Sequence, residues 1–400
     1  MLRRGALAAL VVALGVVPAA GAWTKLGSGG LDNAVDPSAV VLANGTTLVA
    51  YREPKAHAVV VGKRVVAKGL ASVADPRLVQ LANGDVVLFV ADENGVESWT
   101  SSNGGKTWTG PAATGSHDVG DVQSAAAMKD GTPFFTQDGT GFLNVYEGTA
   151  APRNVFPRCC GYAESVAVDS HGLAQVAFWS NATGKAGYLY GKLDGPFRTL
   201  SSGPTTENSA RVPLVADGAG NTFAGFANGY PAATSFVVET LHGGSTAHKV
   251  TVAKGTFTGN EPLMALAVDA GDRLWAVWTE GREVWAARSR SHGAHFGAAV
   301  HVAEPGSAYV LEAAAEPDGS VQTIVNDGTS LSTQKLLPGL TVQVGGKSVR
   351  VLDDGFPVAG ATVHATGATQ TTDAAGRATF PAAPGRVSVT APGYAPASGV

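Results

Sequence analysis

The chain has 400 residues, 44% of them hydrophobic, and a formal net charge of −4 at pH 7. Its basic residues form no block or stripe, which makes nucleic acid and anionic membrane surfaces poor candidate partners. The 52 glycines and 21 prolines lie among short apolar runs. This composition indicates many short strands and tight turns, with room for one large and one small all-β domain.

Residues 1–22 have the layout of a secretory signal peptide. Arg3 and Arg4 precede the apolar run from Ala6 to Val17, and a small-residue exit ends at Ala22. The alternative, an uncleaved anchor helix, needs about 20 apolar residues to span a bilayer, and this run is shorter. We therefore expect cleavage after Ala22, no membrane insertion of the mature chain, and a secreted, extracellular or cell-surface location.

An internal repeat runs through residues 23–337. DPSAVVLANGTTLVAYRE (36–53) and DPRLVQLANGDVVLFVAD (75–92) match as two apolar strands joined by an Asn-Gly turn. Asn-Gly between two such runs is a strong hairpin signal, because both turn residues take positive φ. Looser copies begin at residues 122, 163, 211, 262 and 310.

Two more short strands lie between successive hairpins, for example in GVESWTSS and KTWTGPA. Four strands per unit of about 40–50 residues is the repeat of a β-propeller. Seven copies predict seven blades, and six is the alternative if one weak unit is irregular. The last unit has three strands, so we expect the N-terminal segment AWTKLGSGG to supply its outer strand and close the ring.

The stretch SSNGGKTW falls between the third and fourth strands of the second unit. Its residues Ser101, Asn103, Gly105, Thr107 and Trp108 resemble the Asp-box, or BNR repeat, of sialidase-like propellers, with Asn103 in place of the Asp. The resemblance implies a folding turn on the outside of the propeller, away from the central site. There the polar side chain bonds the backbone and the Trp packs between sheets. The sequence shows this as its only good copy.

The repeated hairpins also look like those of the sialidase superfamily, in which an Arg-x-Pro opening places the arginine at the central mouth. Arg211-Val212-Pro213 matches that opening. The resemblance implies three arginines that grip a substrate carboxylate, a Tyr primed by a Glu, and an Asp as acid/base. Of the seven aligned strand starts, only Arg211 is an arginine. The weak catalytic candidates are Asp75, Glu207 and Tyr309.

Several carboxylates and arginines are predicted to face one mouth of the ring. Crowded carboxylates raise one another's pKa values or recruit a cation, and either effect favours a ligand site without naming a reaction. Structural ion pairs at the arginines and turn-starting Asp-Pro pairs are the alternatives. The candidate ligand-binding residues are Arg211, Arg52, Asp36, Asp75, Arg158, Glu164 and Glu261.

Two other groups of residues carry weaker signals. Cys159 and Cys160 are adjacent, closer than the usual disulfide spacing, so a distorted vicinal bridge and a reduced pair are both open. His292, His295 and His301 have a metal-like spacing, but strand alternation separates their faces. No metal site and no cofactor are expected, apart from a structural cation at the propeller mouth.

Beyond residue 337 the composition changes. GFPVAGATV, TTDAAGRATF and VTAPGY resemble the carboxypeptidase regulatory-like, or transthyretin-like, β-sandwich. The resemblance covers residues 338–400 and implies a non-catalytic accessory domain that stabilises, spaces or binds. It does not imply peptidase activity.

The sequence therefore predicts an exported monomer with a propeller and a small β-sandwich, which binds a glycan or other polar ligand at the propeller mouth without catalysis. A divergent glycoside hydrolase of sialidase type is one alternative, and a structural cell-surface scaffold is the other. The number of arginines that converge on the mouth discriminates between the binding protein and the hydrolase.

Overall fold

The computed structural model describes residues 22–28, 37–70, 75–117, 120, 122–139, 142–156, 161–180, 187–200, 211–229, 232–257 and 263–400. Regular structure in these ranges consists of β-strands and one short 3-10 helix, Pro54–Ala56, which confirms the predicted all-β class. None of the described helical structure is long and apolar enough to span a bilayer. The expected signal peptide, apart from Ala22, lies outside the described residues.

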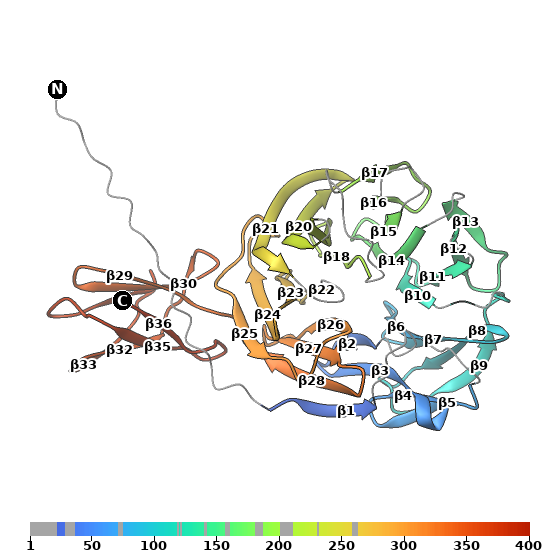
Figure 1. The fold of residues 1–400 in the computed structure, drawn as a ribbon, viewed down its shortest axis with the longest axis horizontal. Coiled ribbons are helices and arrows are strands. Elements are labelled where there is room, and N and C mark those ends of the chain that lie inside the picture. Colours follow the sequence, from blue (N-terminus) through green and yellow to red (C-terminus); the bar gives the residue numbers. More distant parts are fainter. Residues whose placement is uncertain are drawn as a thin grey trace.

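Seven four-stranded antiparallel sheets form a ring, and each is called a blade (Figure 1). Blades 1 and 2 consist of β2 (Ser38–Val41), β3 (Thr47–Glu53), β4 (Ala58–Val61), β5 (Arg64–Lys68), β6 (Pro76–Gln80), β7 (Val86–Asp92), β8 (Gly95–Ser101) and β9 (Thr109–Ala113). Blades 3 and 4 consist of β10 (Val122–Ala127), β11 (Pro133–Gly139), β12 (Phe142–Glu147), β13 (Arg153–Phe156), β14 (Gly161–Val168), β15 (Ala174–Ser180), β16 (Gly187–Lys192) and β17 (Phe197–Thr199).

The remaining three blades complete the ring. Blades 5 and 6 consist of β18 (Leu214–Ala216), β19 (Asn221–Asn228), β20 (Ala233–His242), β21 (Ser245–Phe257), β22 (Met264–Val268), β23 (Leu274–Glu280), β24 (Glu283–Ser289) and β25 (Val300–Ala303). Blade 7 consists of β26 (Val310–Ala315), β27 (Val321–Asn326), β28 (Ser330–Leu336) and the N-terminal β1 (Thr24–Ser28).

The ring closes between the two ends of this region, as predicted. Each inner strand contacts the inner strand of the next blade, and β26 contacts β2. The N-terminal strand β1 pairs antiparallel with β28, with Thr24 opposite Thr333. Tyr51 of blade 1 donates a hydrogen bond to the Leu26 carbonyl at 2.9 Å, which ties β1 to the first blade as well. This pairing covers the outer edge that the three-stranded last repeat would expose.

Each interface between neighbouring blades has its own apolar core. The core between blades 1 and 2 contains Leu48, Val59, Leu88 and Trp99, and the one between blades 6 and 7 is built around Trp275. Seven such cores, one for every interface, surround the ring. Burial of apolar side chains on both faces of each sheet is therefore what holds the blades together.

The C-terminal domain consists of two further sheets that share a core. One contains β29 (Thr341–Gly345), β30 (Ser348–Asp353), β31 (Phe356–Pro357) and β34 (Arg377–Thr379); the other contains β33 (Ala368–Thr371), β32 (Thr362–Ala365), β35 (Val387–Thr390) and β36 (Ala397–Gly399). The shared core contains Val349, Val351, Val363, Val389 and Phe380. Figure 1 shows this domain beside β24 and β25 of blade 6.

The turn between β8 and β9 has the hydrogen bonds expected from SSNGGKTW. The Gly105 N–H donates to Ser101 Oγ at 2.8 Å, and the Thr107 N–H donates to Asn103 Oδ1 at 2.9 Å. Gly105 has a φ of 80°, a conformation that favours glycine. Trp108 packs against the core between blades 1 and 2. The motif thus stabilises a turn and lies outside the channel lining described below.

A second turn of this kind lies between β24 and β25, which corrects the expectation of a single copy. The Gly293 N–H donates to Ser289 Oγ at 3.0 Å, and the His295 N–H donates to Ser291 Oγ at 3.2 Å. Phe296 packs against the core between blades 5 and 6, just as Trp108 packs against the core between blades 1 and 2. This copy is difficult to recognise in the sequence because Ser291 and His295 stand where Asn103 and Thr107 stand in blade 2.

Candidate functional site

The third residue of every aligned repeat faces a central channel with a volume of about 350 Å³. The seven residues at this position are Ser38, Arg77, Ser124, Ser165, Pro213, Met264 and Glu312. Sequence analysis compared the first residue of each repeat and so missed Arg77 and Glu312. The signal was present two residues further on, because alternate residues of a strand share a face.

Arg77 enters the channel from blade 2, where the contacts that hold it include two hydrogen bonds to carbonyl groups and one ion pair. Its Nε donates to the Gln123 carbonyl at 2.9 Å, and its Nη1 donates to the Pro76 carbonyl at 2.9 Å. Its Nη2 lies 3.5 Å from an Asp75 carboxylate oxygen, and both side chains are buried. Asp75 therefore orients Arg77 from behind, which is a different position from the exposed mouth that the sequence suggested.

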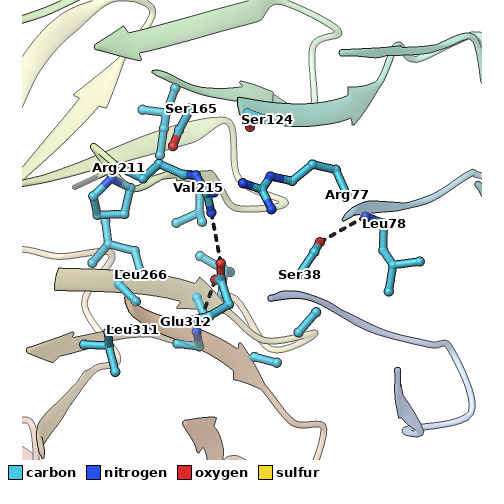
Figure 2. A pocket seen from close by; sticks show the side chains of 18 of the residues that line it. Ser38, Arg77, Leu78, Ser124, Ser165, Arg211, Val215, Leu266, Leu311 and Glu312 are labelled. Carbon is cyan, nitrogen blue, oxygen red and sulfur yellow. Dashed lines mark hydrogen bonds and ion pairs between the residues drawn. The ribbon is translucent and has the colours of Figure 1, made fainter. Parts of the chain in front are cut away.

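Arg211 reaches the same channel from blade 5. Its Nη1 lies 3.3 Å from Glu312 Oε2 of blade 7, so this ion pair spans the blade between them. The two side chains are 21% and 22% exposed, which leaves both accessible from the channel. Figure 2 shows Arg77 and Arg211 extending toward the same space from opposite sides, with Glu312 next to Arg211.

Serine side chains at the third position connect neighbouring blades. Ser38 Oγ of blade 1 accepts a hydrogen bond from the Leu78 N–H of blade 2 at 2.9 Å. Ser124 Oγ of blade 3 accepts one from the Val166 N–H of blade 4 at 3.0 Å. Ser165 Oγ of blade 4 is also buried, but it has no hydrogen-bond partner among the described residues.

Replacing Ser124 and replacing Ser165 with alanine are expected to have different effects on the free energy of unfolding. Ser124→Ala leaves the buried Val166 N–H without its acceptor, so we expect it to lower the free energy of unfolding by about 1–3 kcal/mol. Ser165→Ala removes a buried hydroxyl that has no partner, so no loss of stability is expected. Denaturant unfolding of the two variants measures the difference, and equal losses would contradict the assignment of the Ser124 hydrogen bond.

The third-position ring has a polar side and an apolar side. Glu312, Ser38, Arg77, Ser124 and Ser165 follow one another from blade 7 to blade 4, and they supply the charges and hydroxyls. Blades 5 and 6 contribute Pro213 and Met264 instead, and Leu266 lies beside them. The third-position side chains are therefore polar in five blades and apolar in two, and Arg211 adds a charge from blade 5 beside the apolar ones.

The other predicted residues lie in various places. Arg52 is buried in β3, and Glu164 is completely buried in β14 next to a register shift of that strand. Tyr309 is half-buried just before β26, and its N–H donates to the Asn326 carbonyl. The channel lining, as far as the structure describes it, contains none of these three. The predictions for Asp36, Arg158, Glu207 and Glu261, and for Cys159 and Cys160, fall outside the described residues.

The three histidines with metal-like spacing have separate acidic partners. His292 Nδ1 lies 2.8 Å from Asp217 Oδ2, His295 contacts Asp354, and His301 Nδ1 lies 3.1 Å from Glu283 Oε2. Within the described residues, no group of three or more His, Cys, Asp or Glu side chains could hold a metal ion.

The channel lining contains guanidinium groups that can bind an anion, although each is paired with a carboxylate in this structure. Two guanidinium groups and one carboxylate line the described channel, and the Asp75 carboxylate is used to hold Arg77. Guanidinium groups present several N–H donors in a plane and match carboxylate and sulfate geometry. A ligand anion could compete with Glu312 for Arg211, because that pair is partly exposed to the channel.

No protein-family model and no curated protein matches this sequence. Among solved structures, the chain is similar to hydrazine synthase from Kuenenia stuttgartiensis, with a TM-score of 0.50 and 12% identity over 76% of this chain and 96% of that one. It is also similar to virginiamycin B lyase from Staphylococcus aureus (TM-score 0.48, 12% identity, 78% and 99% covered).

A third similar structure is a Hadza microbial sialidase, with a TM-score of 0.43 and 13% identity over 73% of this chain and 74% of that one. Identities this low carry information about the fold alone. The ring of four-stranded sheets described above gives this chain the β-propeller fold.

Proposed function

We propose that the protein is an exported, non-catalytic binding protein that holds an acidic glycan, or a similar polar anion, in the channel of its propeller. The observation that carries this proposal is the convergence of Arg77 and Arg211 on one cavity from blades 2 and 5. A cavity of about 350 Å³ lies in the size range of small-ligand sites, so it would take a small molecule or one end of a chain.

The two sides of the channel support a sugar as the ligand. The partly exposed Glu312 carboxylate can accept hydrogen bonds from sugar hydroxyls. Pro213, Met264 and Leu266 present hydrocarbon to the other side, where the C–H face of a pyranose ring would pack. An acidic sugar combines these two faces with an anionic group for the arginines.

The arrangement of the carboxylates supports binding over hydrolysis. Sialidase-type chemistry needs a nucleophile and a separate acid/base next to the scissile bond. Glu312 is paired with Arg211, and Asp75 is buried against Arg77. Tyr309, the nucleophile that the resemblance suggested, lies outside the described lining.

The proposal is tested by calorimetric titration of residues 23–400 with glucuronate-containing and neutral oligosaccharides of equal length. In parallel, the protein is assayed for turnover of a panel of fluorogenic glycosides that includes sialosides. We expect heat from the acidic sugars and no turnover of any glycoside. Turnover that is lost in an Arg211→Ala variant would contradict the proposal and indicate that the protein is a glycosidase.

Export is part of the same proposal. It rests on the layout of residues 1–22. Recovery of a chain that begins at Trp23 from the culture medium or cell surface would support it. Retention of the uncleaved chain inside the cell would count against it.

A further inference from the structure

The turn of blade 6 has a serine where the equivalent turn of blade 2 has an asparagine. In blade 2, Asn103 Oδ1 accepts from the Thr107 N–H, and Asn103 Nδ2 donates to Thr107 Oγ1 at 2.7 Å. One side chain thus connects two positions of the turn. In blade 6 the shorter Ser291 replaces Asn103; its Oγ accepts from the His295 N–H at 3.2 Å and also lies 3.1 Å from His295 Nδ1.

A carboxylate from the C-terminal domain contacts the same two side chains of the blade-6 turn. Asp354 Oδ2 accepts from Ser291 Oγ at 3.0 Å and from the Arg290 N–H at 2.6 Å. Asp354 Oδ1 is in contact with Nδ1 of His295. Asp354 therefore adds a second connection between Ser291 and His295, which stand at the positions of Asn103 and Thr107 in blade 2.

The backbone of the C-terminal domain aims this carboxylate. Asp354 has a φ of 50° and Gly355 a φ of 80°, so the two residues form the tight tip between β30 and β31. Just before them, Asp353 accepts from Arg288 Nη2 of blade 6 at 2.5 Å. Two neighbouring carboxylates at one hairpin tip thus enter blade 6 together.

Apolar and aromatic contacts surround these polar ones. The Arg288 guanidinium lies 5.5 Å from the ring centre of Tyr394, and that of Arg290 lies 4.7 Å from the ring centre of Phe356. Ala395 belongs to the apolar core between blades 6 and 7. The interface therefore combines a desolvated ion pair with packing, which is unlike a flexible tether between independent domains.

We propose that the turn of blade 6 is a two-part motif, in which the propeller supplies the frame and the C-terminal domain supplies the carboxylate through Asp354. The C-terminal domain is then a fixed part of blade 6, not a spacer joined only by the Pro338–Leu340 linker. Its orientation relative to the channel follows from the same contacts.

The test introduces an aspartate at the equivalent position of the blade-6 turn and of the blade-2 turn, in the full-length protein. Ser291→Asp places a second carboxylate against Asp354, whereas Asn103→Asp is the matched change in a turn whose hydrogen bonds, among the described residues, come from within the turn itself. We expect Ser291→Asp to lower the melting temperature by about 4 °C or more and Asn103→Asp to change it by less than about 2 °C. Limited proteolysis at the linker should become faster in Ser291→Asp alone.

A double variant separates charge repulsion from general damage to the turn. Ser291→Asp with Asp354→Asn moves the carboxylate from the C-terminal domain into the propeller, and asparagine tolerates the positive φ of position 354. We expect this double variant to recover most of the lost melting temperature and the resistance of the linker. The proposal is overturned if Ser291→Asp behaves like Asn103→Asp in both measurements, or if the double variant is no better than Ser291→Asp.

Discussion

Replacing Asp353 with alanine is expected to lower the free energy of unfolding by about 3–5 kcal/mol, the usual cost of removing one partner of a buried ion pair. Asp353 and Arg288 have side chains that are 1% and 4% exposed, and their closest atoms are 2.5 Å apart. The variant would leave the Arg288 charge buried against Trp275 and Tyr394. Tyr394 would also lose the acceptor of its hydroxyl.

Thermal and denaturant unfolding of the Asp353→Ala chain measure this loss. Arg153→Met is the matched control, because Arg153 pairs with Glu147 and Asp194 on the surface, where such pairs contribute about 0–1 kcal/mol. Arg288→Met added to Asp353→Ala should recover part of the stability, since no charge would then be buried alone. A loss no greater than that of Arg153→Met would show that the domain interface contributes little.

Replacing Arg211 with methionine is expected to weaken the binding of an acidic oligosaccharide by about 10-fold to 150-fold, the equivalent of losing one charged hydrogen bond worth about 1.5–3 kcal/mol. Methionine keeps much of the side-chain volume and removes the charge. Glu312 would also lose its partner and repel the ligand anion, which adds to the effect. Calorimetric titration of the variant with glucuronate-containing oligosaccharides measures the change.

Arg64→Met is the control for this experiment, because Arg64 is an exposed residue of β5 that does not belong to the described channel lining. It removes the same charge from the protein as a whole and should leave the affinity within about twofold, since long-range attraction is screened by salt. Equal affinities of the two variants would place the ligand somewhere other than the channel.

The sequence was sufficient for the architecture because the signals for it are local. Each Asn-Gly or related turn between apolar runs specifies one hairpin within about twenty residues, and repetition of that unit implies the ring. The place of β1 also followed from counting strands, because the last repeat lacked one. These features need no knowledge of which side chains meet across the ring.

The channel was harder to predict because its register depends on where the inner strands begin. Arg77 lies two residues after Asp75. The repeats are aligned correctly, but their third residues face the channel, whereas the prediction compared their first residues. Asp75 and Glu164 were expected at an open mouth, yet both are buried. A shift of two residues along a strand keeps the face and changes the depth, and a sequence carries little information about depth.

The contact between the domains could not be found in the sequence for a different reason. Asp354 acts on a turn that is 63 residues away from it in the chain, and only the folded structure brings the two together. The blade-6 motif is not evident in the sequence because Ser291 and His295 replace the residues that Asn103 and Thr107 represent in blade 2. Ser289 and Gly293, with the spacing of Ser101 and Gly105, were the signal that remained.

The most direct test of a ligand-binding channel is to soak crystals of the full mature chain with a glucuronate-containing oligosaccharide and determine the structure. The account predicts density for the sugar in the central channel, with its carboxylate within hydrogen-bond distance of Arg211 or Arg77 and the pair between Arg211 and Glu312 opened. Sugar bound on the outer strands or on the C-terminal domain, with that ion pair intact, would contradict it.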